Sequence, residues 1–306
     1  MLIHEWPTPR DPGRVTLLGA NGFVARAVAD RLEQAGVEVR RLPREALDLT
    51  AADAHARLAD LLDPRDVLVM AAARAPVKTN AQLIENLVMM QAVCAAIVAV
   101  PPAHVVYVSS DAVYADDDAP LTETSRAEPA SLHGAMHATR EIMLRQAFTG
   151  PTAMVRPTLI YGPGDPHNGY GPNRFVRQAR MGEDIALFGG GEERRDHVQV
   201  ADVADLIARI VRHRSSGVLN IATGAVWSFA EIAAQVAAAF GGRPALRSLP
   251  RAGPMPHGGY RPFDAAAVGR AFPDFAFTAL PEGLARLCAE DEVVHGDAPA
   301  PPVESS

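Results

Sequence analysis

Near the N-terminus the sequence reads Val15-Thr-Leu-Leu-Gly19-Ala-Asn-Gly22-Phe-Val-Ala25. The residues before Gly19 predict a buried strand, and the pattern after Gly22 predicts a helix. Small residues in the turn let the backbone approach a pyrophosphate, whose negative charge the helix N-terminus favours. Glycine turns after strands are common, but this one joins a strand to a helix, which favours nucleotide binding. The candidate cofactor residues here are Gly19, Asn21, Gly22, Phe23 and Ala25.

Short apolar strands and amphipathic helices alternate along the chain, which predicts an α/β fold with a doubly wound parallel Rossmann sheet. We expect the dinucleotide-binding domain at residues 14–165, completed by about 198–222, and a smaller, mainly C-terminal substrate-binding lobe at 166–197 and 223–290. Residues 1–13 and 295–306 are expected to be flexible tails. Expected strands cover 15–18, 37–42, 67–71, 104–109, 152–156 and 218–221, and expected helices cover 23–34, 83–98, 134–148 and 203–211.

Composition excludes several classes of function. The formal net charge is -7, from 29 basic and 36 acidic residues with no long basic block, so we expect neither a nucleic-acid partner nor a membrane-seeking face. The two cysteines, Cys94 and Cys288, predict neither a disulfide framework nor a cysteine metal site. No basic leader opens the chain, and no apolar run approaches the ~20 residues of a membrane span. We therefore expect a cytoplasmic protein.

Arginines gather around the end of the second expected strand, where many NAD sites carry an acidic residue for the ribose hydroxyls. The chain has Arg40, Arg41 and Arg44 there. A planar guanidinium suits a 2′-phosphate, so the sequence favours NADP over NAD. The alternative is that these arginines form a solvated surface.

Several further motifs follow the glycine turn, and together they span roughly residues 14 to 285. Their order resembles that of the extended short-chain dehydrogenase/reductases, the family of sugar-nucleotide epimerases, dehydratases and 4-ketoreductases. Residues 47–50 and the compact length are most similar to the 4-ketoreductases. The motifs that carry the resemblance are the glycine turn, Asp48-Leu49-Thr50, Ala71-Ala72-Ala73, Asn86, Ser109-Ser110-Asp-Ala-Val-Tyr114, Arg156-Pro157, Tyr161-Gly-Pro-Gly164, Arg195-Asp-His-Val and Asp202-Val203.

The resemblance implies roles for individual residues. Ser110 would hydrogen-bond the reacting sugar oxygen, although a serine at the end of a strand can also simply cap the local chain. Asn86 would buttress the active-site helix. Implied cofactor contacts are Asp48 and Leu49 beside the adenine and Ala71 and Ala72 beside the nicotinamide.

Histidine replaces both proton-transfer residues of the family. Its tyrosine passes a proton to or from the substrate oxygen, and its lysine lowers the tyrosine pKa and binds cofactor ribose; His133 and His137 stand at those positions in the segment 129–141. An unperturbed histidine pKa near ~6.5 lies close to working pH, so His133 can act as general acid or base. His137 lies one helical turn further on the same face, where it could orient His133 or contact the ribose.

Two other interpretations of this helix remain open. The histidines may be remnants in a protein that binds nucleotide without reacting. Alternatively, His133, His137 and Glu141 share a face with metal-ligand spacing, but no convincing further ligand is visible and we expect no metal.

Arginines also mark the substrate side. The resemblance places Arg195 and Arg261 where sugar-nucleotide enzymes bind the diphosphate and the nucleoside, and a guanidinium fork suits phosphate oxygens. Surface salt bridges are the alternative. Arg74 is a candidate for the sugar, and Asn168 is a weaker one.

Together these features predict an NAD(P)-dependent oxidoreductase that reduces a 4-keto sugar nucleotide, with Ser110, His133 and His137 as catalytic residues. A 4-epimerase with tightly bound NAD is the nearest alternative. A catalytically silent nucleotide-binding protein and a cofactor-free isomerase or lyase represent other classes. The apolar helices at 83–98 and 134–148 could form a homodimer interface or simply cover the sheet.

Overall fold

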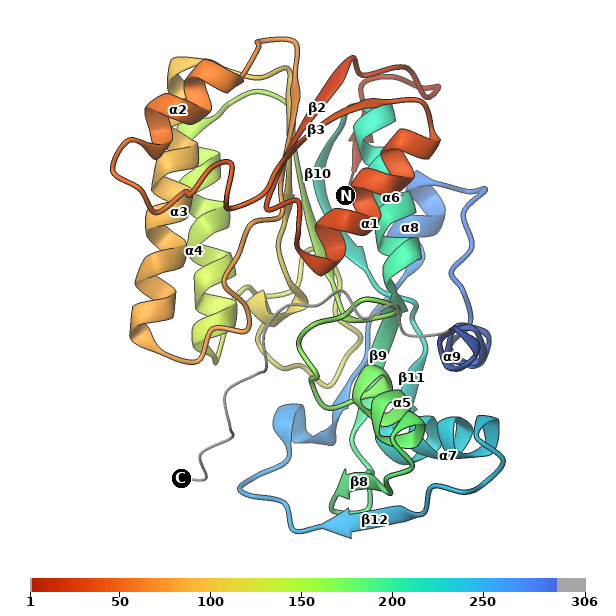
Figure 1. Ribbon diagram of the computed structural model, residues 1–306. Coiled ribbons are helices and arrows are strands. Elements are labelled where there is room, and N and C mark those ends of the chain that lie inside the picture. The colour runs from red at the N-terminus through yellow and green to blue at the C-terminus, as the bar shows by residue number, and fades with distance from the viewer. Residues whose placement is uncertain (1, 291–306) are drawn as a thin grey trace.

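The computed structural model describes residues 2–290, and its centre is a seven-stranded sheet (Figure 1). The strand order is β1-β10-β6-β5-β4-β2-β3, and every neighbouring pair is parallel except β1 with β10. The order in which the chain adds strands to the sheet reverses between β2 and β4: β3 lies on one side, and β4, β5 and β6 follow on the other. Doubly wound Rossmann sheets have the same switch point. The predicted fold class is therefore confirmed. The strands are β1 (Ile3–His4), β2 (Arg14–Leu18), β3 (Glu38–Leu42), β4 (Val67–Met70), β5 (His104–Val108), β6 (Thr152–Pro157) and β10 (Ser215–Ile221).

Helices cover both faces of this sheet (Figure 1). Successive side chains of a strand point to opposite faces. Leu17 accordingly joins the apolar cluster under α1 and α6, whereas Leu18 joins the cluster under α2 and α3. The covering helices are α1 (Phe23–Gln34), α6 (Val200–His213) and α8 (Ala266–Ala271) on one face, and α2 (Ala54–Leu61), α3 (Asn80–Ala99) and α4 (Leu132–Ala147) on the other.

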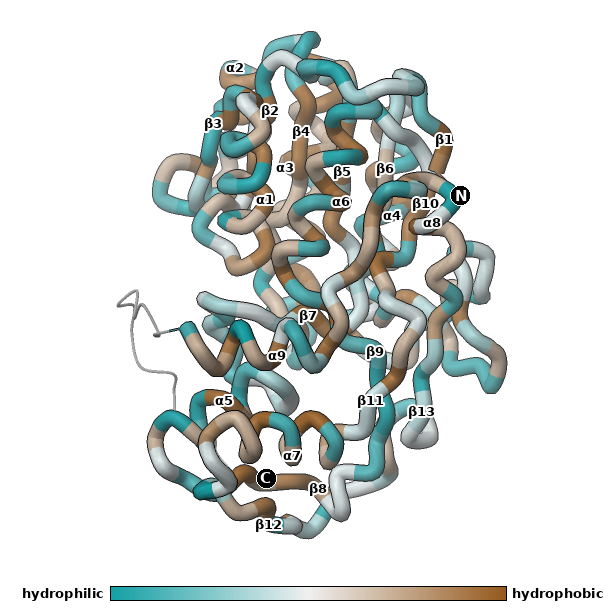
Figure 2. Tube along the Cα trace, turned by 90° about the vertical axis from the view of Figure 1, so that its right-hand side faces the viewer, coloured by the Kyte–Doolittle hydropathy of each residue, from teal (hydrophilic) through white to brown (hydrophobic). Residues whose placement is uncertain are grey.

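A smaller lobe lies beyond the carboxyl ends of the parallel strands, and Figures 1 and 2 show it beneath the sheet domain from two directions. Its core forms where α5, α7 and α9 pack together around Phe175 and Phe229. The carboxyl edge of the sheet therefore faces this lobe. Its elements are β7 (Leu159–Tyr161), α5 (Pro172–Arg180), β8 (Ile185–Phe188), β9 (Arg194–Gln199), β11 (Val226–Ser228), α7 (Phe229–Ala239), β12 (Leu246–Leu249), β13 (Tyr260–Arg261) and α9 (Leu280–Ala289), with 3₁₀ turns η1 (Asp111–Val113) and η2 (Pro256–Gly259).

The predicted element boundaries differ from the observed ones mainly at helix starts. The helix predicted at 23–34 has those bounds, but α3 and α4 begin earlier than predicted because Thr79 and Ser131 cap them. The Thr79 side chain accepts from the Gln82 backbone in a capping box, a signal that the apolar periodicity does not carry. Several short elements of the lobe, such as α5 and α7, were not predicted.

The N-terminal segment is not a flexible tail over its described part, which corrects that expectation. Ile3 pairs with Ser216 across an antiparallel ladder, and the His4 imidazole Nδ1 lies 2.7 Å from the Ser215 hydroxyl. The Trp6 backbone N–H donates to the His213 carbonyl, which continues the attachment. These contacts add a strand to the edge of the sheet. The tail predicted at 295–306 lies outside the described residues.

Helix α3 is longer and more apolar than the sequence analysis allowed. It has 20 residues and a mean hydropathy of 1.6 over its most apolar window, so it meets the length and composition expected of a membrane span. This corrects the statement that no apolar run approaches that length. The helix packs between α2 and α4, and residues such as Met90, Val93 and Ile97 join the core cluster. This packing accounts for the apolar residues on one face of the helix.

Candidate active site

The glycine turn lies at the carboxyl end of β2, at the point where the strand order reverses. Gly19 has a φ of 78°, and a Cβ there would lie 2.6 Å from Cα of Ala72, so this close approach requires glycine. Gly22 precedes α1 and brings no side chain to cap the first-turn N–H groups. Those donors and the helix dipole favour an anion. The turn therefore fits the pyrophosphate of a dinucleotide.

The other predicted residues of this turn are placed around it. Ala25 is buried in α1 against the sheet, and Phe23 is half-buried at the helix start. The Asn21 amide lies 3.3 Å from a carboxylate oxygen of Glu45. Its side chain thus links the turn to the loop after β3.

Protein groups hold two of the arginines predicted to bind a 2′-phosphate, Arg40 and Arg41. Arg40 donates to the Leu61 carbonyl at the end of α2, and Arg41 pairs with Asp30 and Glu33 of α1. They diverge because adjacent strand residues point to opposite faces. Arg44 follows the strand, and its side chain is 64% exposed. Arg44 is therefore the arginine best placed to meet a ligand at this edge.

The predicted adenine-side residues mainly serve the local chain. One Asp48 carboxylate oxygen accepts from the Thr50 backbone N–H at 2.9 Å and from its hydroxyl at 2.6 Å. These hydrogen bonds hold the Asp48 pKa below its usual range. Leu49 is buried within the core cluster beneath α2. A direct ligand contact would have to come from the exposed part of Asp48.

The loop after β4 follows the predicted arrangement only in part. Ala72 contacts the glycine turn, and the Ala71 backbone N–H donates to the Leu18 carbonyl. The fully buried Asn86 bonds the backbone of Arg74 in both directions. Asn86 therefore supports this loop directly, not the active-site helix as predicted. The Arg74 guanidinium pairs with Glu85 at 2.5 Å and is more than half exposed.

The N-terminal half of α4 lies against η1. Ser131 caps the helix by accepting from the Gly134 backbone at 3.1 Å. A Cβ at Gly134 would fall 2.0 Å from the Ala112 carbonyl oxygen, so only glycine permits this contact. The contact brings the residues around Ser110 beside His133.

The two candidate histidines meet as the helical spacing predicts. Their ring centroids are 4.8 Å apart and the rings are nearly perpendicular, at 89°. Nδ1 of His133 is buried and has no hydrogen-bond partner among the described residues. Burial lowers the His133 pKa, and the charge of Asp111 partly opposes that effect. His133 is thus a neutral, unengaged imidazole near neutral pH.

His137 is engaged on one side. Its Nδ1 lies 2.8 Å from the hydroxyl of Tyr107, which projects from β5 toward the α3–α4 face. Burial lowers the His137 pKa well below its usual range, and the neighbouring His133 and Arg140 lower it further. Sequence reasoning missed Tyr107 and Arg140. A tyrosine in a buried strand needs a hydroxyl partner, and that was the available signal.

Ser110 adopts the capping role that was its alternative interpretation. Its hydroxyl accepts from the Ala112 backbone N–H at 3.1 Å and lies 3.3 Å from an Asp111 carboxylate oxygen. It remains at the end of β5, beside the helix that carries His133. Capping and contact with a substrate oxygen are compatible, because a hydroxyl has both a donor and two acceptor lone pairs.

The two predicted substrate arginines come together on neighbouring strands. Arg195 of β9 is in register with Arg261 of β13, and the Asp111 carboxylate lies 3.8 Å from one and 3.3 Å from the other. Arg261 is almost fully buried and also donates to the Asp111 and Tyr114 carbonyls. The surface salt bridge alternative is thereby excluded for Arg261. Asn168 lies apart from this group, where it accepts from Arg177.

Glu141 is committed to a structural ion pair. Its two oxygens accept from Arg156 at 2.9 and 2.6 Å, and one also accepts from the Ser109 hydroxyl. These partners lower the Glu141 pKa against the opposing effect of burial. Within residues 2–290, no cluster of three or more metal-ligating side chains occurs. Glu141 is accordingly not available as a third ligand beside the histidines.

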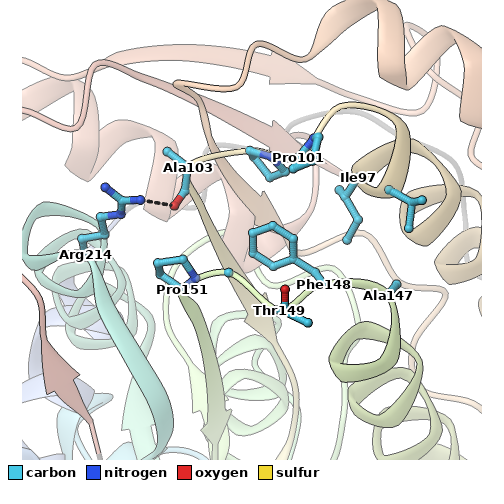
Figure 3. Close-up of a pocket in the computed structure, with 11 residues that line it drawn as sticks. Ile97, Pro101, Ala103, Ala147, Phe148, Thr149, Pro151 and Arg214 are labelled. Carbon is cyan, nitrogen blue, oxygen red and sulfur yellow. Dashed lines mark hydrogen bonds between the residues drawn. The ribbon is translucent and has the colours of Figure 1, made fainter.

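A separate hollow of about 400 Å³ lies at the opposite end of the sheet (Figure 3). It is lined mainly by apolar residues near the C-terminal ends of α3 and α4, including Ile97 and Phe148. Its cation, Arg214, donates to the Ala103 carbonyl and pairs with Glu5. Ligands of open α/β sheets bind at the carboxyl ends of the strands, so the histidine side is the candidate active site.

Fold and site define a class: a Rossmann dinucleotide-binding protein of the extended short-chain dehydrogenase/reductase type with a smaller second lobe. A family model described as "NAD dependent epimerase/dehydratase family" matches residues 15–222. The chain belongs to this family. The family is described as NAD dependent, and its cofactor class is NAD(P).

Curated relatives include reductases and epimerases of nucleotide sugars. A dTDP-4-dehydro-6-deoxy-D-allose reductase of Streptomyces bikiniensis is 31% identical over 103 residues, 32% of this chain and 31% of that protein. A probable UDP-glucuronate 4-epimerase of Rhizobium meliloti (strain 1021) is 28% identical over 66% of this chain and 56% of its own length. The chain thus spans between a third and little more than half of these relatives.

Solved structures show the same architecture over almost the whole chain. MoeE5 in complex with UDP-glucose and NAD has a TM-score of 0.76 and 25% identity, over 90% of this chain and 97% of its own. The GDP-L-fucose synthetase of Naegleria fowleri bound to NADP has a TM-score of 0.79 at 16% identity and 93% coverage of both chains. The second likeness supports the fold alone.

Proposed function

We propose that this chain reduces a 4-keto sugar nucleotide with NADPH and that His133 supplies the proton. The observation that carries the proposal is the unengaged His133 imidazole, which lies beside Ser110 and the loop of Asp111 at the carboxyl edge of the sheet. This arrangement combines a proton donor, a hydroxyl and two guanidinium groups around one edge. The proposal includes a cytoplasmic location without nucleic-acid or membrane partners.

NAD(P)H, when bound, supplies the hydride at the sugar carbon. Protonated His133 would donate its ring proton to the keto oxygen, so that hydride and proton together convert C=O into CH–OH and His133 becomes neutral. Solvent then returns the proton to the ring. The Ser110 hydroxyl would donate a hydrogen bond to the same oxygen. Arg195 and Arg261 would bind diphosphate oxygens. Before substrate binds, the Asp111 carboxylate balances their charge.

The preference for NADP over NAD rests on Arg44. Its guanidinium is exposed beyond β3, and its pair with Asp48 is long, at 3.3 Å, so a 2′-phosphate can compete for it. Equilibrium titration of NADPH and NADH on wild type and Arg44→Ala tests this preference. A selective loss of NADPH affinity is expected, and an equal effect on both nucleotides would assign the protein to NAD.

The reaction itself is tested with purified protein, NADPH and a dTDP-linked 4-keto-6-deoxy sugar. We expect stoichiometric NADPH oxidation that His133→Ala abolishes and that His55→Ala, an exposed change on α2, leaves intact. Product analysis by NMR must show a new hydroxyl at C4. NADPH binding without turnover on any keto sugar would favour a silent binding protein.

A 4-epimerase is the second candidate, and the epimerases among the relatives favour it. It would interconvert UDP-glucose or UDP-glucuronate with NAD and show no net change in reduced cofactor. Conversion that proceeds in protein freed of nicotinamide would instead indicate a cofactor-free isomerase or lyase.

A further inference from the structure

A fully buried cation lies behind the histidine pair. Arg140 is 0% exposed, and its guanidinium donates to the Ala72 carbonyl at 3.0 Å and approaches the Met136 sulfur at 3.7 Å. No carboxylate within residues 2–290 forms an ion pair with it. Arginine keeps its proton in proteins, so this site holds an uncompensated positive charge. Burying a cation without a counter-charge costs free energy, because the charge loses its hydration.

The Tyr107 side chain lies between this cation and His137. The guanidinium carbon is 5.7 Å from the Tyr107 ring centre, so the positive charge of Arg140 acts directly on the Tyr107 side chain. Burial raises the Tyr107 pKa to about 12, so the hydroxyl keeps its proton at neutral pH. A guanidinium carries a positive charge and no acceptor, so it cannot accept the hydroxyl proton. The one hydroxyl proton must therefore point elsewhere.

The remaining partner of that hydroxyl is Nδ1 of His137, at 2.8 Å. Since the hydroxyl proton points away from Arg140, Nδ1 accepts a hydrogen bond from the hydroxyl and carries no proton of its own. A neutral imidazole with an accepting Nδ1 bears its proton on Nε2. Burial and the charge of Arg140 both disfavour a second proton on the ring.

We propose that Tyr107 and Arg140 are positioning residues that hold His137 as the neutral Nε2–H tautomer. His137 then serves as a fixed hydrogen-bond donor to an oxygen of the bound cofactor or sugar, and His133 alone carries the transferred proton. The inference deepens the proposed function and rests on it for the role of His133. The tautomer itself does not depend on any substrate.

The opposite tautomer makes a different prediction. If Nδ1 carried the proton and donated to Tyr107, the Nε2 lone pair would be free to accept a proton from His133. The pair would then form a relay, and the tyrosine hydroxyl would have to direct its own proton at a cation. Nitrogen-15 NMR of histidine-labelled protein separates the two cases, because protonated and unprotonated ring nitrogens have distinct shifts.

The experiment compares wild type with Tyr107→Phe and uses Tyr161→Phe as a matched control. Tyr161 is equally buried, and its hydroxyl has no partner among the described residues, so removing that oxygen breaks no hydrogen bond there. We expect His137 to be protonated at Nε2 in wild type and in Tyr161→Phe, and to show mixed tautomers in Tyr107→Phe. A proton on Nδ1 in wild type would overturn the inference.

Arg140 variants provide a second test. Arg140→Lys keeps the cation and should keep the wild-type tautomer, whereas Arg140→Met removes the cation without leaving a buried charge and should weaken the tautomer preference. Dinucleotide affinity should fall by roughly threefold to tenfold in Tyr107→Phe, as expected for one hydrogen bond. Unchanged His137 signals in both Tyr107→Phe and Arg140→Met would also overturn it. A correct tautomer in a protein without turnover would refute only the proposed reaction.

Discussion

Arg156 of β6 binds both carboxylate oxygens of Glu141 on α4, at 2.9 and 2.6 Å, and neither side chain is more than 6% exposed. The same guanidinium donates to the Tyr114 hydroxyl at 2.7 Å, and that hydroxyl donates to Asn220 at 2.7 Å. One network thus ties the active-site helix to the centre of the sheet and to the loop that follows Ser110. His133 lies on the same helix, two turns before Glu141.

Glu141→Gln should destabilise the fold because it leaves the Arg156 charge buried without its counter-charge. The expected loss is about 3 kcal/mol in the free energy of unfolding, measured by urea titration. The matched control is Glu282→Gln, which removes an exposed pair with Arg286 and should cost well under ~1 kcal/mol. A Glu141→Gln protein as stable as the control would show that this pair carries little of the helix attachment.

Gly134→Ala should disturb the active site. Alanine normally favours a helix by about 1 kcal/mol, but here its Cβ would lie 2.0 Å from the Ala112 carbonyl oxygen. We expect lower stability and a loss of activity of at least about tenfold, because η1 and His133 must move apart. Gly269→Ala, in open space on α8, is the control and should be neutral or stabilising. Equal behaviour of the two variants would contradict the close contact.

Reduction should slow as pH rises. Burial lowers the His133 pKa, and the acid form required for proton donation disappears as pH rises through that lowered pKa. The kcat/KM for keto-sugar reduction should therefore fall toward higher pH with a slope of one, and alcohol oxidation should show the reverse. Initial rates across pH 5–9 check this. In His133→Tyr, the fall of kcat/KM should occur at higher pH than in wild type. A fall at the same pH would mean that another group donates the proton.

Acid should destabilise the protein before carboxylates titrate. Burial lowers the pKa of His104 to about 4 and that of His197 to about 3, so between pH 6.5 and these values the unfolded chain binds protons that the folded chain does not. The contribution of these two neutral histidines to the free energy of unfolding is thus fully present above pH 6.5. It falls as pH drops, by roughly 3 kcal/mol for His104 at pH 4. Denaturant titrations at stepwise pH measure the slope.

His197→Phe isolates one part of that effect. The ring packs edge-on against Phe229 at 5.5 Å, so phenylalanine fits the same surroundings without a titrating group. The stability of the variant should depend less on pH below 6.5 than that of wild type. An unchanged slope in His197→Phe would mean that this site is hydrated or already protonated.

A homodimer through α3 and α4 is also predicted. Ile84, Val88 and Val98 of α3 and Ile142 of α4 are exposed by 38% to 62% and form an apolar surface on neighbouring helices. Light scattering at micromolar concentration should give the mass of a dimer, and Ile84→Lys should shift it to a monomer. Met181→Lys, an equally exposed change in the lobe, should leave the mass unchanged. A monomeric wild type would defeat this prediction.

The sequence by itself determined the sheet, the glycine turn and the helix that carries His133 and His137, because strand alternation, helical periodicity and turn chemistry are local properties. Arg195 and Arg261 were also predicted as substrate-side residues, but from a family pattern. Tertiary structure decided which of these residues are engaged. Arg41 is held by Asp30 and Glu33, and Asp111 lies beside two arginines whose strands are neighbours in space but far apart in the sequence.

Tyr107 and Arg140 illustrate the physical reason. Each looks ordinary in its own element, a tyrosine in a buried strand and an arginine in a helix. Their chemistry follows from burial and from partners up to 68 residues away, as in the bond from Arg140 to the Ala72 carbonyl. Hydrogen-bond direction in the interior depends on every neighbouring donor and acceptor at once, so only the folded arrangement determines which nitrogen of His137 carries the proton.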